Sequence, residues 1–266
     1  MTFSSEMVLA WLASIVWPLC RISGLLMTMA VFGSRLVPIQ VRILLCLAIT
    51  LVVAPVLPAM PGTPLFSVGG FLITIQQVLI GVAMGQLTLF LTESFVMAGQ
   101  VLAMQTSLGF ASLVDPMNGQ SAPVIGQFYL MLATLVFLAV DGHLVLIRLV
   151  ILSFDTLPVA QQGIASLVYR DMAAFLGVMF QSALLMSLSA IVALLLINFS
   201  FGVMTRAAPQ LNVFSIGFAV SMIAGLFILW LTIGSFTDHF GRIWERIQEL
   251  LCMVIGTRCE GGVGGG

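Results

Sequence analysis

Long apolar runs dominate the chain and follow one another with few polar residues between them. The runs lie near residues 7–31, 43–60, 68–92, 124–152, 173–199 and 211–236. Most of them approach or exceed the ~20 residues that a membrane-crossing helix needs. No polar module or low-complexity linker interrupts the series. The pattern therefore predicts an all-α integral membrane protein of about six long helices, built as a single helical domain over residues 1–258.

Breaks and changes of period refine these predicted helices. Four prolines between residues 55 and 64 end the second run in a turn-rich connection, because helix cannot persist through them. Residues 93–108 keep a helical pattern, so the third helix is expected to extend beyond its apolar run. Residues 237–258 set charged positions opposite an apolar face, which predicts a C-terminal amphipathic surface helix. The glycine-rich residues 259–266 are expected to form a disordered tail.

Composition agrees with the membrane assignment. Hydrophobic residues make up 61% of the 266 residues and charged residues only 7%, whereas roughly a quarter of the residues of a soluble domain are charged. The formal net charge is −1, and this argues against nucleic acid as a partner. Cys20 and Cys46 lie in apolar runs, and the spacing of Cys252 and Cys259 matches no zinc signature. We expect no disulfide framework from this pattern.

The stretch from Gln105 to Pro123, QTSLGFASLVDPMNGQSAP, places helix-breaking and small polar residues between two apolar runs. At membrane depth, backbone freed from a helix is tolerated only where it is buried in protein or lines a water-filled cavity. One interpretation is therefore a pore or cavity element. The other is an ordinary extramembrane loop, and the residues alone leave both open.

Charged residues inside apolar runs are the next notable feature. Arg21 lies in the middle of the first run, and Asp141, His143 and Arg148 lie together in the fourth. Charges exposed to lipid cost several kcal/mol, so these groups are expected to face protein. Asp141 and Arg148 are two helical turns apart on roughly one face, which allows either a proton or ion relay or a structural ion pair. The scarcity of carboxylates favours the structural interpretation.

Small residues and loop charges add two further expectations. Gly81 and Gly85 form a GxxxG pattern, which is typical of close helix contacts in membranes but weak evidence alone.

Arg35 and Arg42 place the first loop in the cytoplasm, and alternation across six spans then puts the arginine-bearing C-terminus outside, against the positive-inside rule. Either one span is re-entrant or doubled, or simple insertion does not decide the final position of the chain.

Signatures of catalysis are missing from the sequence. It contains no HExxH, no phosphate-binding GK[ST] loop and no GxSxG elbow. It also has no matched pair of interrupted helices, which would point to an inverted-repeat transporter. We therefore predict no catalytic residues, no cofactor-binding residues and no metal site, and expect a protein that is not an enzyme.

Four segments together resemble one family. They are FGSRLVPIQVRILLCLAIT (32–50), QTSLGFASLVDP (105–116), FLAVDGHLVLIRLVILSFDTLP (137–158) and GVMTRAAPQLNVFSIGF (202–218). In this order and spacing they resemble the flagellar biosynthetic protein FliR family and its injectisome relatives.

The resemblance implies a non-enzymatic subunit of the flagellar type III protein export gate in the bacterial inner membrane, within the flagellar basal body. Together with FliP and FliQ, such a subunit forms the channel for unfolded flagellar proteins. FlhB wraps the base, and FlhA and the basal-body ring are further expected partners. The helices would form a FliP-like part followed by a FliQ-like helical hairpin. Helices raised out of the bilayer plane would explain why the charge rule fails.

The resemblance also implies roles for particular residues. Residues 105–123 resemble a plug loop that closes the pore at rest, with Gln105, Gly109, Phe110, Leu113, Asp115 and Pro116 as plug residues. The turn between the last two long helices matches Arg206, Pro209, Gln210 and Asn212. These four, with Arg21, Asp141, His143 and Arg148, are expected to be inter-subunit or structural polar residues. Two alternatives remain: a small-solute or ion transporter with Asp141, His143 and Arg148 as a relay, and a membrane scaffold.

Overall fold

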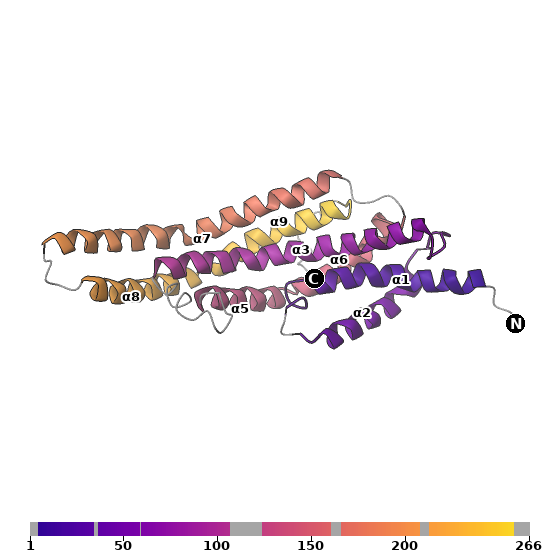
Figure 1. Ribbon diagram of the computed structural model, residues 1–266, viewed down its shortest axis with the longest axis horizontal. Helices are drawn as coiled ribbons and strands as arrows, with labels where there is room; N and C mark the ends of the chain where they lie inside the picture. The colour runs from indigo at the N-terminus through magenta and orange to yellow at the C-terminus, as the bar shows by residue number, and fades with distance from the viewer. Residues whose placement is uncertain are drawn as a thin grey trace. The chain divides into compact units, whose positions relative to one another are not determined.

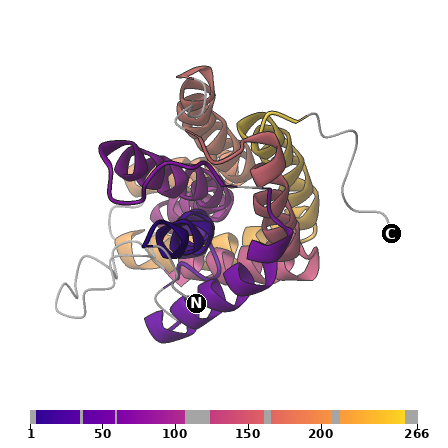
Figure 2. The same cartoon turned by 90° about the vertical axis from the view of Figure 1, so that its right-hand side faces the viewer.

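The computed structural model describes residues 5–34, 37–58, 60–106, 124–160, 166–207 and 213–257. These residues form helices and connections, and no strand occurs among them (Figures 1 and 2). The elements are α1 (Ser5–Thr28), α2 (Ile39–Val53), the short 3-10 helix η1 (Ala54–Val56), α3 (Val68–Gln105), α5 (Val124–Ala139), α6 (Gly142–Thr156), α7 (Ser166–Ala207), α8 (Val213–Ile233) and α9 (Phe236–Val254).

Four helices are long and apolar enough to cross a membrane, at Met7–Thr28, Ile39–Val56, Val68–Gln105 and Arg170–Met204. Two further candidates are bent pairs, α5 with α6 at 62° and α8 with α9 at 58°. The predicted all-α membrane fold with long, partly kinked helices is thereby confirmed, with four to six candidate spans in the described part of the chain. The apolar run expected over 124–152 is one of these bent pairs, with the helix interrupted at Val140 and Asp141.

Helix ends agree with the local sequence. Pro38 precedes α2, and Pro55 lies in η1, where the α-helix has already given way to a tighter turn. The helix expected to continue beyond residue 92 does so, since α3 runs without interruption to Gln105. The amphipathic helix expected over 237–258 is α9, with Phe240, Ile247 and other apolar side chains buried and its charged positions exposed.

The helices group into two compact units. Unit 1 contains residues 1–90, 137–174 and 245–266, and unit 2 contains residues 91–136 and 175–244. Helices α3, α7 and α9 each contribute to both units, so the grouping does not divide the chain into consecutive domains. The single domain over residues 1–258 stays a prediction.

In unit 1, α1 and α3 run parallel and in close contact. A Cβ placed on Gly24 would lie 2.8 Å from the carbonyl oxygen of Val78, and one placed on Gly81 would lie 2.9 Å from the backbone nitrogen of Leu25. Further along α3, a Cβ placed on Gly85 would lie 2.7 Å from the carbonyl oxygen of Leu25 in α1. The contacts advance in the same direction on both helices, which defines the parallel arrangement. Glycine is required here because no side chain fits between the two backbones.

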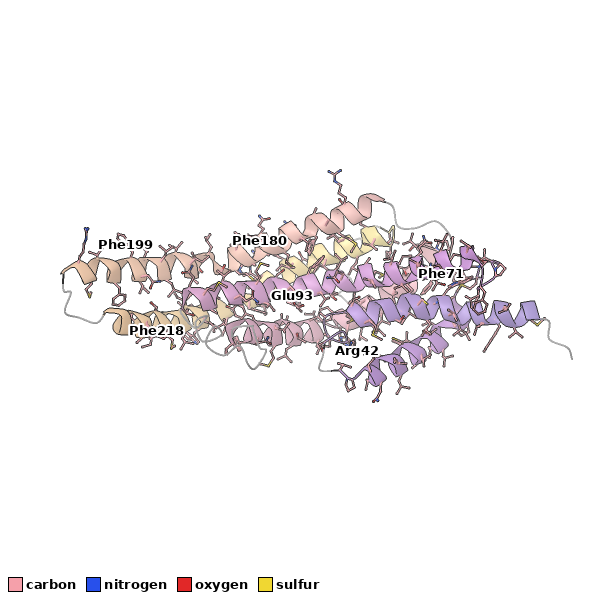
Figure 3. All side chains as sticks on the ribbon, viewed as in Figure 1. Arg42, Phe71, Glu93, Phe180, Phe199 and Phe218 are labelled. Atoms are coloured by element: carbon pink, nitrogen blue, oxygen red, sulfur yellow. The ribbon has the colours of Figure 1, made fainter. Side chains whose placement is uncertain are left out.

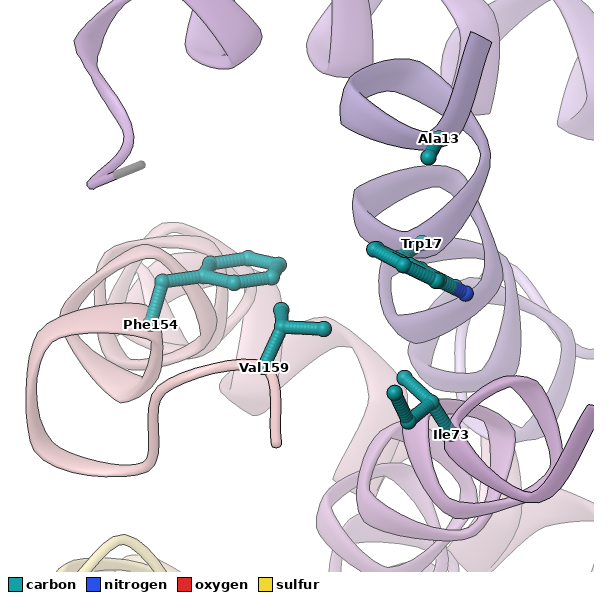
Figure 4. Close-up of a cluster of buried hydrophobic side chains, with 5 residues drawn as sticks. All are labelled: Ala13, Trp17, Ile73, Phe154 and Val159. Carbon is teal, nitrogen blue, oxygen red and sulfur yellow. The ribbon is translucent and has the colours of Figure 1, made fainter. Parts of the chain in front are cut away.

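A cluster of buried apolar side chains also joins α1, α3 and α6 in unit 1 (Figure 4). Its members are Ala13, Trp17, Ile73, Phe154 and Val159. Trp17 and Ile73 are completely buried. Burial of aromatic and aliphatic side chains such as these contributes most of the packing energy of a helical core.

In unit 2, α7 and α8 form an antiparallel hairpin. The hydroxyl of Ser221 donates to the side-chain oxygen of Asn198 at 2.9 Å, and a Cβ placed on Gly217 would lie 3.6 Å from the ring of Phe201. Residue numbers fall on α8 as they rise on α7, which gives the antiparallel direction. The hairpin architecture expected for the last two long helices is therefore present.

One cysteine differs from expectation. Cys252 of α9 is disulfide-bonded, whereas Cys20 and Cys46 are free thiols. The expectation of no disulfide is therefore wrong for Cys252. The positions of the four cysteines in the sequence carry no recognisable pairing signal.

Candidate functional site

The predicted plug segment begins at the end of α3, and only its first two residues are described. Gln105, the last residue of α3, is partly buried, and Thr106 is completely enclosed. Thr106 packs against α8, since a Cβ placed on Gly225 would lie 2.9 Å from the Cβ of Thr106. The hydroxyl of Thr106 donates back to the carbonyl of Ala103 at 3.1 Å. This end of the segment is therefore fixed to unit 2.

The chain returns to the described structure at Val124, where α5 begins. Near this start, the backbone of Gly126 meets α3, and a Cβ placed on Gly99 would lie 2.7 Å from the Cα of Gly126. Further along α5, Tyr129 contacts the ring of Phe236 and the hydroxyl of Thr232. Both ends of the 105–123 segment thus belong to the same set of packed helices. Gly109, Phe110, Leu113, Asp115 and Pro116 lie outside the described residues, and their plug role stays a prediction.

Arg21 is the second candidate, because it is a completely buried charge in α1. Its Nε donates to the side-chain oxygen of Gln77 in α3 at 2.8 Å. One terminal nitrogen donates to the carbonyl and the hydroxyl oxygen of Ser153, at 2.8 and 2.9 Å. The other donates to the carbonyl of Leu157 at 2.9 Å, and the guanidinium lies 4.2 Å from the ring centroid of Phe154.

The partners of Arg21 are neutral, so the charge is stabilised in another way. Ser153 and Leu157 lie in the last turn and at the C-cap of α6, where most backbone carbonyls have no partner within the helix, although that of Ser153 also accepts from the N–H of Leu157 at 2.9 Å. A helix C-terminus carries roughly half a negative charge, which a cation compensates. The aromatic face of Phe154 adds a cation–π attraction. Arg21 therefore joins α1, α3 and the end of α6 at one point.

The other polar residues singled out in the sequence are not brought together. Asp141 and Arg148 have exposed side chains, and among the described residues no ion pair or hydrogen bond joins either of them to the other or to His143. The direct ion pair considered between Asp141 and Arg148 does not form within this chain, since two helical turns separate the two side chains by about 10 Å. Nδ1 of His143 is buried without a described partner.

Arg206 is exposed in the last turn of α7, where a positive charge suits the helix terminus. Pro209, Gln210 and Asn212 lie outside the described residues. The inter-subunit or structural role of these residues stays a prediction.

The sequence did not reveal the partners of Arg21. Gln77 is recognisable in the sequence as an amide in an apolar run that needs a partner, but nothing there pairs it with Arg21. The carbonyls of Ser153 and Leu157 had no such signal, since every residue carries one. Within the described part of the chain, no group of three or more His, Cys, Asp or Glu side chains is arranged to hold a metal ion.

Comparisons with known proteins cover nearly the whole chain. The family described as "Bacterial export proteins, family 1" matches residues 12–247. The flagellar biosynthetic protein FliR of Pectobacterium carotovorum subsp. carotovorum is 37% identical over 255 residues, covering 94% of this chain and 97% of the relative. FliR of Escherichia coli (strain K12) is 34% identical, covering 93% and 96%, and FliR of Buchnera aphidicola subsp. Acyrthosiphon pisum (strain APS) is 30% identical, covering 88% and 90%. The chain therefore belongs to the FliR family of bacterial flagellar export proteins.

Proposed function

We propose that this chain is a subunit of the flagellar export gate, assembled with FliP and FliQ, and that residues 105–123 close its pore at rest. The observation that carries the proposal is the frame around this segment. Thr106 is packed against Gly225 at one end, and Gly126 is packed against Gly99 at the other. A segment whose two ends are both packed into one set of helices can be displaced without detaching, which is what a resting plug requires.

The residues of the segment suit closure of a pore for unfolded chains. Phe110 and Leu113 provide apolar side chains, and a hydrophobic constriction excludes water and ions. Gly109 and Pro116 disfavour continuous helix, so the backbone can take up turns. This composition gives no specific binding pocket, in keeping with a channel that passes many sequences.

Exposed apolar surface on the α7–α8 hairpin supports assembly with other membrane subunits. Phe180 and Phe199 of α7 and Phe218 of α8 are about half exposed or more, at 53%, 68% and 43% (Figure 3). Only 17% of an 18-residue apolar stretch within Arg170–Met204 is buried inside the chain. We propose that this hairpin is the FliQ-like part and that FlhB, FlhA and the basal-body ring contact the assembled gate in the inner membrane.

Deletion of residues 109–120 is expected to make cells leaky to ions when FliP and FliQ are present, because the pore loses its apolar closure. The measurement is the membrane potential of cells expressing the variant, followed with a potential-sensitive dye. The control is the same variant expressed without FliP and FliQ, which should leave the potential unchanged. Loss of export with an intact potential would contradict the plug role and would favour a transporter inactivated by the deletion.

Purification through a tag on this chain, after co-expression with FliP and FliQ from the same source, is expected to yield one discrete complex. Native mass spectrometry should show a single copy of this chain with several copies of FliP. A stable monomer or homodimer without these partners would contradict the proposed assembly, whatever the outcome of the plug experiment.

A further inference from the structure

The joint between α5 and α6 has an unusual backbone. Asp141 has φ 54° and ψ 26°, which is the left-handed helical conformation. It is the only non-glycine residue with positive φ in the described part of the chain. This conformation is disfavoured for residues with a Cβ, least so for Asn and Asp, and glycine adopts it freely. A residue held in this state marks a position where the surrounding structure imposes the geometry.

The backbone of Asp141 serves both helices. Its N–H donates to the carbonyl of Leu138 at 3.1 Å, which closes the last turn of α5. Its carbonyl accepts from the N–H groups of Leu144 at 2.9 Å and Val145 at 3.1 Å, which opens the first turn of α6. The left-handed residue thus ends one helix and starts the next without leaving its own backbone groups unpaired.

The carboxylate of Asp141, in contrast, makes no hydrogen bond or ion pair with the described residues. An aspartate at a helix N-cap ordinarily has extended backbone and accepts a hydrogen bond from an N–H of the first turn. Here the backbone is left-handed, no such side-chain bond forms, and the side chain is exposed. The observed use of this residue is therefore conformational.

The next residue imposes a second demand on the same joint. Gly142 is buried, and a Cβ placed on it would lie 2.6 Å from Cδ2 of the completely buried Phe137 ring. No residue with a Cβ fits at this position unless the Phe137 ring moves. The Asp-Gly pair thus provides a left-handed residue followed by a residue without a Cβ, and Phe137 closes the inside of the turn.

We propose that Asp141 is a positioning residue for protein export, acting through its left-handed backbone to set the start of α6, and that its carboxylate is dispensable. The proposal depends on the family's role in flagellar export. It does not depend on the plug or on the identity of the gate partners, so it stands or falls separately from them.

Four substitutions separate backbone conformation from charge. Asp141→Gly and Asp141→Asn remove the charge but tolerate the left-handed state, whereas Asp141→Glu keeps the charge and Asp141→Val lacks it, and both disfavour that state. Each variant replaces the chromosomal copy. Secreted flagellin is measured and normalised to the amount of the chain in the membrane.

The glycine and asparagine variants should export within about twofold of the parent, while the glutamate and valine variants should fall by at least roughly fivefold. If Asp141→Glu exports normally while Asp141→Gly and Asp141→Asn fail, the carboxylate is required and the proposal is overturned. Equal export by all four variants, or failure of all four, would overturn it as well. Because the glycine and asparagine variants are expected to fold, their export decides the test even if the other two are degraded.

A second pair of variants tests the joint without touching Asp141. Gly142→Ala should reduce secreted flagellin, because its Cβ meets the Phe137 ring. Adding Phe137→Leu removes the ring carbons and should restore at least half of the lost export. Failure of this second substitution to restore any export, with the double variant present in the membrane, would contradict the proposed geometry.

Discussion

Arg21→Met is expected to lower the free energy of unfolding by about 3–6 kcal/mol, because it leaves two acceptors without a donor and removes a third contact. The two acceptors are the side-chain oxygen of Gln77 and the carbonyl of Leu157, whereas the carbonyl of Ser153 keeps its hydrogen bond from the N–H of Leu157. A loss of this size is a large fraction of the stability of an ordinary domain. The measurement is thermal or denaturant unfolding of the purified protein in detergent, together with its abundance in membranes.

Two variants make the Arg21 result interpretable. Arg21→Lys keeps the charge but concentrates the donors on one nitrogen, so it cannot reach the same acceptors and should give an intermediate loss. Arg170→Met removes an exposed arginine of α7 and should change stability by no more than ~0.5 kcal/mol. Arg21→Met as stable as Arg170→Met would show that the buried network does not hold the helices together.

Gly81→Leu is the second substitution with a large expected effect. The first added carbon would overlap the carbonyl oxygen of Arg21 and approach the backbone nitrogen of Leu25 to 2.9 Å. Both obstacles are backbone atoms, so α1 and α3 have to separate along their parallel contact. We expect a loss of about 3 kcal/mol or more in the free energy of unfolding, at the upper end of overpacking effects.

Gly177→Leu is the matched control for Gly81→Leu. Gly177 lies in α7 and has no atom within 4 Å of a Cβ placed on it. Leucine has a higher helix propensity than glycine, so this variant should keep or gain up to ~1 kcal/mol of stability. Comparable melting temperatures for the two variants would mean that the α1–α3 contact is looser than the structure indicates.

Much of the fold could be predicted because apolar runs and helix breakers are local signals. The ends of α2 and α3 and the amphipathic character of α9 follow from prolines and periodicity. Gly142 allowed a break in the fourth apolar run, but the left-handed backbone of Asp141 did not follow from the sequence, because a single Asp-Gly step is also compatible with continuous helix. The packing of Phe137 onto Gly142, which excludes a Cβ at this joint, is a tertiary contact without a local signal.

In the candidate site, too, local features could be predicted from the sequence and contacts between distant residues could not. The position of Arg21 in a run predicted that it would need partners, but its acceptors lie 56 to 136 residues away in the sequence. Gly81 and Gly85 form a pattern in the sequence, whereas Gly24 on the opposite helix does not. Contacts that depend on backbone atoms of distant helices leave no residue-type signature.

Membership in the FliR family confirms the prediction of a multi-span membrane protein of flagellar export that is not an enzyme. The transporter alternative loses support, since Asp141 and Arg148 are exposed and not joined within the chain. The bent pairs α5–α6 and α8–α9 are each either a broken span or a re-entrant loop, so the number of crossings assumed in the loop-charge prediction is not fixed. Alternation presumes that each apolar run crosses the bilayer once, and a bent pair does not define a single crossing.

The network around Arg21 has a consequence for a membrane with different acidity on its two faces. Arginine keeps its proton throughout the physiological range, and the amide, hydroxyl and carbonyl groups that it contacts do not titrate there. An ion pair with a carboxylate would weaken as the surroundings became acidic, because the acid would take up a proton. The hydrogen bonds that join α1, α3 and α6 therefore keep their strength whichever face of the membrane is the more acidic.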